Sequence, residues 1–224
     1  MNIIYLLLIT IFLGLSGCTN YDAAAPVRDI NVHRVGKIQY HLVQPGETLY
    51  AIAWRYEKDY RGLALLNNLS PPFKVKPGDL IQLTGKSTRK SKYHIHAKAA
   101  PHSVVQHWVW PTTQHHIIRA FSSNNKGIDI AGNFKAPVFA TAKGKVVYAG
   151  NGIRGYGNLL IIKHNAIYLT AYAYNNRLLV KQGQWVKLGQ KIALMGENNN
   201  LGRTALHFEI RRAGRAVNPR RYLG

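Results

Sequence analysis

The sequence predicts a mainly β protein of two modules, a small βααβ unit followed by a larger antiparallel β domain. The 224 residues, 46% of them hydrophobic, exceed the usual size of a single domain. Within residues 40–83, strand-like runs enclose two stretches with apolar residues at helical spacing. From residue 108 onward, short runs rich in β-branched and aromatic residues alternate with glycine turns, as in 144–150 and 158–163.

The N-terminus predicts a secretory signal peptide, residues 1–17, followed by a lipid anchor. The apolar run over residues 3–15 is too short to span a bilayer as a mature helix but has the length of a signal-peptide core. Leu15-Ser16-Gly17-Cys18 resembles the lipobox of bacterial lipoproteins, in which the cysteine is lipidated. With Thr19 rather than aspartate next, the resemblance implies a Gram-negative outer membrane. The alternative is that Cys18 is a small apolar residue of an ordinary signal peptide.

The charge balance indicates a polyanionic partner outside the cytoplasm. Thirty lysine and arginine residues stand against nine aspartate and glutamate residues, a formal net charge of +21, and none of these charges lies in residues 1–17. Such a balance usually suggests nucleic acid. Export favours an anionic cell-wall polymer or lipopolysaccharide instead, so we expect peptidoglycan and no nucleic acid. The single cysteine lies at the anchor and leaves none for disulfides in the mature modules.

Two segments predict connections between compact units. Residues 18–39 contain three successive alanines and a proline without sustained periodicity, which indicates a lipidated tether from membrane to wall. Residues 84–107 are basic and lack a buried face, which indicates a linker. The compact units are then residues 40–83 and 108–224.

The first compact unit carries strand, turn and cap signals in the order βααβ. Residues 40–43 predict a strand, and Thr48 is placed as N-cap of a helix that runs through Tyr56. A second helix is expected from about Asp59 to near residues 67–68. A turn and a final strand over 80–83 complete the unit.

This unit resembles a LysM domain, and the matching positions are Tyr40, with a one-residue shift, Val43, Gly46 to Leu49, Asn67-Asn68 and Pro77 to Leu80. LysM domains bind N-acetylglucosamine-containing chains in a shallow groove between two loops. The resemblance implies that the groove here is formed by Gly46, Glu47, Thr48 and Leu49 on one side and Lys76, Pro77 and Gly78 on the other. The alternative is that the glycines and Pro77 only form turns and that Thr48 only caps a helix.

The second unit resembles the LytM, or lysostaphin-like, zinc metallopeptidase domain over residues 108–222. The matching segments, in order, are 126–130, 137–138, 144–147, 155–158, 183–184, 186, 189–190, 206–209 and 217–219. The resemblance implies a two-sheet antiparallel β domain with the active groove across its larger sheet.

The zinc site of this family is depleted in the present sequence. Active members take two zinc ligands from His-x-x-x-Asp and a third from the second histidine of His-x-His, and leave the fourth position to water. A further histidine, in Tyr-Ala-His, joins the first histidine of His-x-His in acid–base chemistry. Here the motifs read Asn125-Lys-Gly-Ile-Asp129, Tyr172-Ala-Tyr174 and Ala205-Leu-His207, so only Asp129 and His207 of five functional positions remain.

We therefore expect no catalytic residues, no metal and no cofactor. An amide oxygen is a poor zinc ligand, and two remaining ligands do not enclose the ion. Ala205 offers no proton, and a tyrosine phenol, with an ordinary pKa of about 10, is a reluctant base at neutral pH. His115 and His116 precede the motif without a spacing that places them in the groove, and His164, between a strand and a turn, is expected to be structural.

The combination of lipobox, LysM module and depleted LytM domain resembles the NlpD group of division proteins. Phrases such as 49–54, 154–158 and 218–222 strengthen the match. The resemblance implies an activator of a periplasmic N-acetylmuramoyl-L-alanine amidase that splits septal peptidoglycan. We expect the amidase to dock in the vacated groove lined by Asn125, Asp129, Tyr174, Ala205 and His207. The alternatives are an activating surface elsewhere, a wall-anchoring binder without activator role, or a weakly active zinc endopeptidase.

Overall fold

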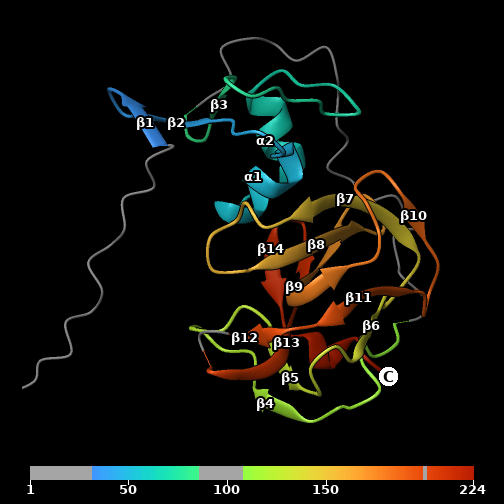
Figure 1. The fold of residues 1–224 in the computed structure, drawn as a ribbon. Helices are drawn as coiled ribbons and strands as arrows, with labels where there is room; N and C mark the ends of the chain where they lie inside the picture. Colours follow the sequence, from blue (N-terminus) through green and yellow to red (C-terminus); the bar gives the residue numbers. More distant parts are fainter. Residues whose placement is uncertain (1–31, 86–107, 199–200) are drawn as a thin grey trace, which may run out of the picture.

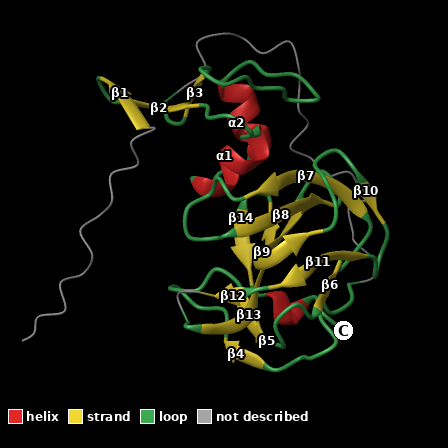
Figure 2. Ribbon diagram, viewed as in Figure 1, coloured by secondary structure: helices red, strands yellow, loops and turns green. Residues whose placement is uncertain are grey.

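The computed structural model describes residues 32–85, 108–198 and 201–224 (Figures 1 and 2). The expected signal peptide, Cys18, most of the tether and nearly all of the linker lie outside these residues. The described part contains a small, mixed module and a larger β domain, in agreement with the predicted mainly β class. None of the described helices is long and apolar enough to cross a bilayer.

The small module contains β1 (Val32–Val35), β2 (Ile38–Leu42), α1 (Leu49–Arg55), α2 (Tyr60–Leu66) and β3 (Leu80–Gln82). Its caps follow the sequence signals. The Thr48 hydroxyl accepts from the backbone of Ala51 at the start of α1, and Asp59 caps α2 by accepting from Arg61. Helix α2 ends at Asn67, whose side-chain amide donates to the carbonyls of both Leu63 and Gln82 and so ties the helix to β3.

Strand β1 lies in a stretch expected to be tether. Val35 pairs with Ile38 across a two-residue turn, and the three strands follow the antiparallel order β1-β2-β3. Gly36 adopts a φ of 60°, which a glycine reaches at no steric cost. A four-residue edge strand with exposed side chains has no hydrophobic alternation, so the sequence offered no period-2 signal for it.

The large domain is built almost entirely of antiparallel strands. They are β4 (Ile117–Arg119), β5 (Ile128–Ala131), β6 (Pro137–Phe139), β7 (Gly144–Gly150), β8 (Asn158–Lys163), β9 (Tyr168–Leu178), β10 (Trp185–Val186), β11 (Lys191–Met195), β12 (Glu197–Asn198), β13 (Arg203–Arg212) and β14 (Arg215–Val217), followed by the 3-10 helix η1 (Pro219–Arg221).

The strands form a branched sheet with the main order β10-β7-β8-β9-β13-β5-β4. Strand β9 is long enough to pair with β8 and β13 along its first part and with β11 near its end. Strand β11 in turn pairs with β6, so these two strands branch from the main sheet.

The central strands are apolar on both faces, and successive residues enter different cores. Leu160 and Ile162 of β8 face the core of the large domain, whereas their neighbours Leu159 and Ile161 face the opposite side. On that second face they join buried residues of helices α1 and α2 in one cluster. A sheet buried on both faces explains why the β8 run is continuously apolar rather than alternating.

The small module is docked on this second face of the sheet (Figure 1). Hydrogen bonds also cross the seam: the Thr48 hydroxyl donates to the Val147 carbonyl at 3.1 Å, Arg55 donates to the Gly152 carbonyl at 2.7 Å, and the Tyr60 hydroxyl donates to the Ala166 carbonyl at 3.2 Å. At Gly214, in the β13–β14 turn, any side chain would collide with the backbone of Asp59. The two modules therefore share a packed, hydrogen-bonded interface.

Candidate functional site

The two remaining motif residues of the large domain meet on neighbouring strands. Asp129 of β5 and His207 of β13 are direct partners in the antiparallel register. The Nδ1 atom of His207 lies 2.8 Å from the Oδ1 atom of Asp129, and both side chains are buried. Gly127 allows this close pairing, because a Cβ there would collide with the Phe208 carbonyl of β13.

The carboxylate of Asp129 is surrounded by donors from four other residues. Arg119 of β4 forms an ion pair with Oδ2 through Nε, and the side-chain amide of Asn125 lies 3.4 Å from the same oxygen. The Asn198 amide lies 3.4 Å from Oδ1, which also contacts His207. Burial raises the pKa of Asp129, but hydrogen bonds and the positive charges of His207 and Arg119 hold it below its ordinary value. The carboxylate is thus ionised and fully engaged.

A second carboxylate continues the network along β13. Glu209 accepts from the Tyr156 hydroxyl at 2.8 Å and from Arg211 Nε at 3.1 Å, and its Oε1 lies 3.2 Å from His207 Nε2. Burial lowers the pKa of His207, but its hydrogen bonds to the two carboxylates and their charges raise it to about 9. At neutral pH His207 is an imidazolium that donates from both ring nitrogens.

These residues do not fit a catalytic zinc ion. Only Asp129 and His207 of the family's three protein ligands are present, and the amide of Asn125 is a poor substitute for the third. The cationic guanidinium of Arg119 is paired directly with Asp129, at the carboxylate that the family uses for metal. Across the described residues, no group of three or more histidine, cysteine, aspartate or glutamate side chains is arranged to hold a metal ion.

Asn125 forms hydrogen bonds that stabilise the loop after β4. Its side-chain amide donates to the Ala120 carbonyl at 3.0 Å, and its backbone closes a turn with Ser122. The residue is buried. The Asn125 amide therefore holds this loop in place through its own hydrogen bonds.

Tyr174 and Ala205 occupy the other two substituted positions. Tyr174 lies at an irregularity in the pairing of β9 with β8 and has a φ of 59°, and its hydroxyl donates to the Gly155 carbonyl at 2.5 Å. Its ring centroid is 6.2 Å from that of His207 in an edge-on arrangement. Ala205 precedes His207 by two residues on the same strand face, and it is completely buried. Tyr174 is the half-buried rim of the site, whereas Ala205 belongs to its floor.

The other histidines of the domain have separate structural contacts. His115 stacks on Trp110 with ring centroids 4.3 Å apart, and His116 is exposed. His164 contacts the Lys143 carbonyl and the Thr170 hydroxyl, each at 2.8 Å, and burial lowers its pKa to about 4. The structure does not bring these three side chains into the Asp129 site.

The expected glycan-binding loops of the small module differ in their exposure. Gly46, Pro77 and Gly78 are exposed turn residues, and both glycines have positive φ values. Glu47 is nearly buried and pairs with His41 at 2.5 Å and with Arg55 at 2.8 Å. The side chain of Leu49 is fully buried in the core. The remaining two expected residues, Thr48 and Lys76, line a cleft beside the large domain.

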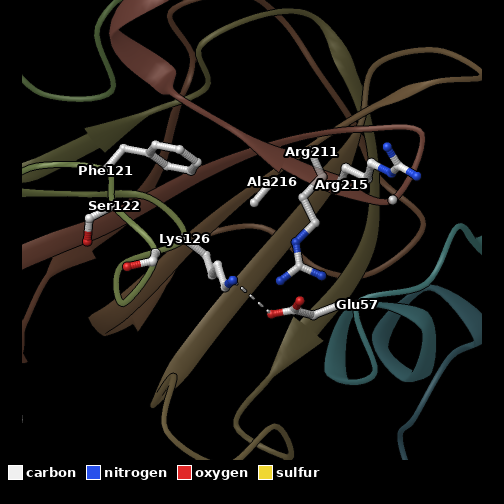
Figure 3. Close-up of a pocket in the computed structure, with 9 residues that line it drawn as sticks. Glu57, Phe121, Ser122, Lys126, Arg211, Arg215 and Ala216 are labelled. Carbon is white, nitrogen blue, oxygen red and sulfur yellow. Dashed lines mark ion pairs between the residues drawn. The ribbon is translucent and has the colours of Figure 1, made fainter.

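The residues that sequence reasoning missed lie on the face that the small module covers. Arg211 is buried, lies 3.7 Å from the centre of the Trp54 ring and donates to the Trp54 carbonyl at 2.8 Å. Next to this contact, a pocket of about 330 Å³ opens at the seam, where Lys126 lies 3.9 Å from Glu57 (Figure 3). The alternation of polar residues at 207, 209 and 211 was a signal that could have identified one functional strand face.

Comparison with known proteins identifies the family. Residues 41–84 match the LysM domain and residues 123–219 match peptidase family M23. A lipoprotein NlpD/LppB homologue of Pseudomonas aeruginosa is 39% identical over 228 residues, covering 82% of this chain and 76% of that protein. The chain belongs to the NlpD/LppB family.

Other relatives are similar over the same share of the chain. The uncharacterized lipoprotein YgeR of Escherichia coli is 42% identical, covering 82% of this chain and 80% of that protein. The murein hydrolase activator NlpD of Escherichia coli is 35% identical, covering 82% and 67% respectively. In this NlpD/LppB chain, the family's two domains are thus both present and packed together.

Proposed function

We propose that this protein is a non-catalytic, peptidoglycan-binding lipoprotein that activates a periplasmic N-acetylmuramoyl-L-alanine amidase during septal cell-wall splitting. The observation that supports it most directly is the engagement of Asp129 by Arg119 and His207 at a site where Asn125 replaces a zinc ligand of the family, a poor site for the metal that would activate water. A relative named as a murein hydrolase activator fits a protein that acts through another hydrolase.

The proposed location rests on the lipobox cysteine and on the LysM module. Lipidated Cys18 would hold the protein on the outer membrane, facing the periplasm, and the exposed LysM loops around Gly46 and Gly78 would bind wall glycan. Relatives named as lipoproteins support the anchor. The +21 net charge supports attraction to a wall polymer that carries carboxylates.

We place the amidase contact at the rim of the depleted site. Of its five residues, Asn125, Asp129, Ala205 and His207 are buried, whereas Tyr174 is only partly buried. Arg119 adds a side chain that is 39% exposed. Beneath these two side chains lies the ion network of Asp129, His207 and Glu209. Such a surface activates an amidase only if it binds the open state of that enzyme more tightly than the closed state.

The docking site is tested at Tyr174, because a large residue at the buried Ala205 would disturb the fold itself. Tyr174→Arg adds bulk and charge at the rim. Asn176→Arg is the matched control, since Asn176 is exposed two residues later on the same strand. We expect only Tyr174→Arg to abolish amidase activation while both variants remain folded. Full activation by a folded Tyr174→Arg variant would place the activating surface elsewhere.

The function itself is tested by dye release from labelled peptidoglycan sacculi. Residues 19–224 are assayed alone and with the cell's own periplasmic amidase, each with and without a zinc chelator in matched amounts. We expect no release by the protein alone and stimulated release when amidase is added. In the mixture, the chelator also affects the amidase. The effect of the chelator on this protein is therefore judged from the assay of the protein alone.

Two other functions predict different results in the same assay. A wall-anchoring binder would sediment with sacculi but leave the amidase rate unchanged. A weakly active zinc endopeptidase would release dye alone, in a chelator-sensitive manner. The second alternative is opposed by the chemistry of the site, in which Asn125 and Ala205 replace two family histidines and Arg119 pairs with Asp129.

A further inference from the structure

A row of side chains on the large domain faces the aromatic side of the LysM module. Trp185 of β10 pairs in register with Lys145 of β7, and Lys145 pairs with Lys163 of β8. Direct partners in antiparallel strands project from the same face. Their chain neighbours Val146, Ile162 and Val186 point into the core of the large domain, so the row points to the side where the small module is docked.

Aromatic rings of the LysM module line the opposite wall, where the partly buried Tyr50 and Phe73 lie beside the buried Tyr60. Tyr50 lies 4.6 Å from Tyr60 and 6.3 Å from Phe73 between ring centroids, and the Lys163 ammonium lies 5.7 Å from the centre of the Tyr60 ring. Between the two walls is a cleft of about 860 Å³, which Thr48 and Lys76 of the expected glycan-binding loops also line. The volume is in the range of sites that hold a ligand of several rings.

The cleft is cationic and has unused binding capacity. No carboxylate within the described residues pairs with Lys145 or Lys163. Burial and the neighbouring charge of Lys145 lower the pKa of Lys163, because both disfavour its positive charge. A bound carboxylate would offset the repulsion between the two ammonium groups. Trp185 is 74% exposed and so presents an apolar ring face to a ligand in the cleft. An anionic ligand with apolar faces matches both features.

We propose that the two modules jointly form one binding cleft for a peptidoglycan strand, in which the LysM rings hold the sugars, Lys145 and Lys163 bind the carboxylates of the stem peptide, and Trp185 packs against its apolar groups. Aromatic faces pack against the apolar faces of sugar rings, and lysines bind carboxylates as charge-assisted donors. This inference rests on the proposed wall binding of the LysM module. It adds that the large domain, away from the depleted zinc site, selects strands that still carry peptides.

The test compares two soluble ligands with residues 19–224, which include every described contact of both modules. One is a neutral chitooligosaccharide, and the other is a glycan strand with intact stem peptides. The variants are Lys145→Glu and Trp185→Ala. Their matched controls are Lys191→Glu, an exposed lysine of β11, and Leu188→Ala, which removes an exposed apolar side chain outside the cleft.

We expect Lys145→Glu and Trp185→Ala each to weaken binding of the peptide-bearing strand by about 5- to 10-fold, the effect of losing one such contact. Lys145→Glu should leave chitooligosaccharide binding unchanged, and both controls should bind like the parent. If the parent binds both ligands and Lys145→Glu has no effect, the composite cleft is wrong while wall binding stands. Polyglutamate, a polyanion without sugar, is a third, control ligand, and equal losses for it would also overturn the cleft. If the parent binds neither ligand, wall binding itself fails.

Discussion

Arg119 places a guanidinium beside the carboxylate that zinc peptidases of this fold use as a ligand. A fixed cation there competes with a metal ion for the same oxygens. We therefore expect that Asn125→His alone does not create a zinc site, whereas Asn125→His combined with Arg119→Ala does. Equilibrium dialysis followed by metal analysis should find about one zinc per chain only in the double variant, since zinc sites need three protein ligands and no competing charge. Arg119→Ala alone is the control. Stoichiometric zinc in Asn125→His alone would show that Arg119 does not compete.

Loss of the His207 proton is expected to lower the free energy of unfolding at alkaline pH. Its pKa in the folded chain, about 9, is raised above the ordinary 6.5, so its stabilising contribution is complete below about pH 6.5 and is lost as pH rises through 9. We expect the free energy of unfolding to fall over this window by at most about 3 kcal/mol. Urea titrations of the parent and of His207→Gln at a series of pH values measure it. The variant should show a flatter profile, and a parent profile as flat as that of the variant would contradict the ion network.

Strand β13 carries two different surfaces, with Leu206, Phe208 and Ile210 in the domain core and alternate residues in the ion network. Arg211 ends this network and donates to the Trp54 carbonyl. Arg211→Ala leaves Glu209 buried without its guanidinium, so we expect a loss of about 3 kcal/mol in the free energy of unfolding. The exposed neighbour Arg212→Ala should cost less than about 0.5 kcal/mol. Similar urea midpoints for the two variants would argue against a structural role for the buried arginine.

Most helices and strands could be predicted from the sequence, but the contacts between distant segments could not. Helix boundaries followed from local chemistry, because Thr48 and Asp59 accept from the first-turn amides wherever the helix is placed. The resemblance to the LytM zinc motifs also implied that Asp129 and His207 belong to one site. Arg119 could not be found in this way, because its role depends on β4 lying beside β5, a pairing between segments that no local pattern fixes. The docking of the small module is equally non-local.

At the scale of the whole molecule, the second face of the sheet joins the two modules. The depleted zinc site and the docked helices share this face, and buried residues of both modules form one cluster. The contact of Arg211 with Trp54 links the ion network directly to α1. The site is therefore supported by the small module as well as by its own domain. A substitution that destabilises one module should therefore also destabilise the other. Two units joined only by a linker would not show this coupling.

This coupling predicts a single cooperative unfolding transition. The four tryptophans report on both modules, since Trp54 lies on α1 and Trp108, Trp110 and Trp185 belong to the large domain. In a urea titration of 5-fluorotryptophan-labelled protein followed by fluorine NMR, we expect all native resonances to be lost at one midpoint. Ile128→Ala, a cavity in the core of the large domain, should cost about 2–5 kcal/mol and shift the Trp54 transition equally. If Trp54 keeps its parent midpoint in that variant, the modules unfold independently and the shared core contributes little stability.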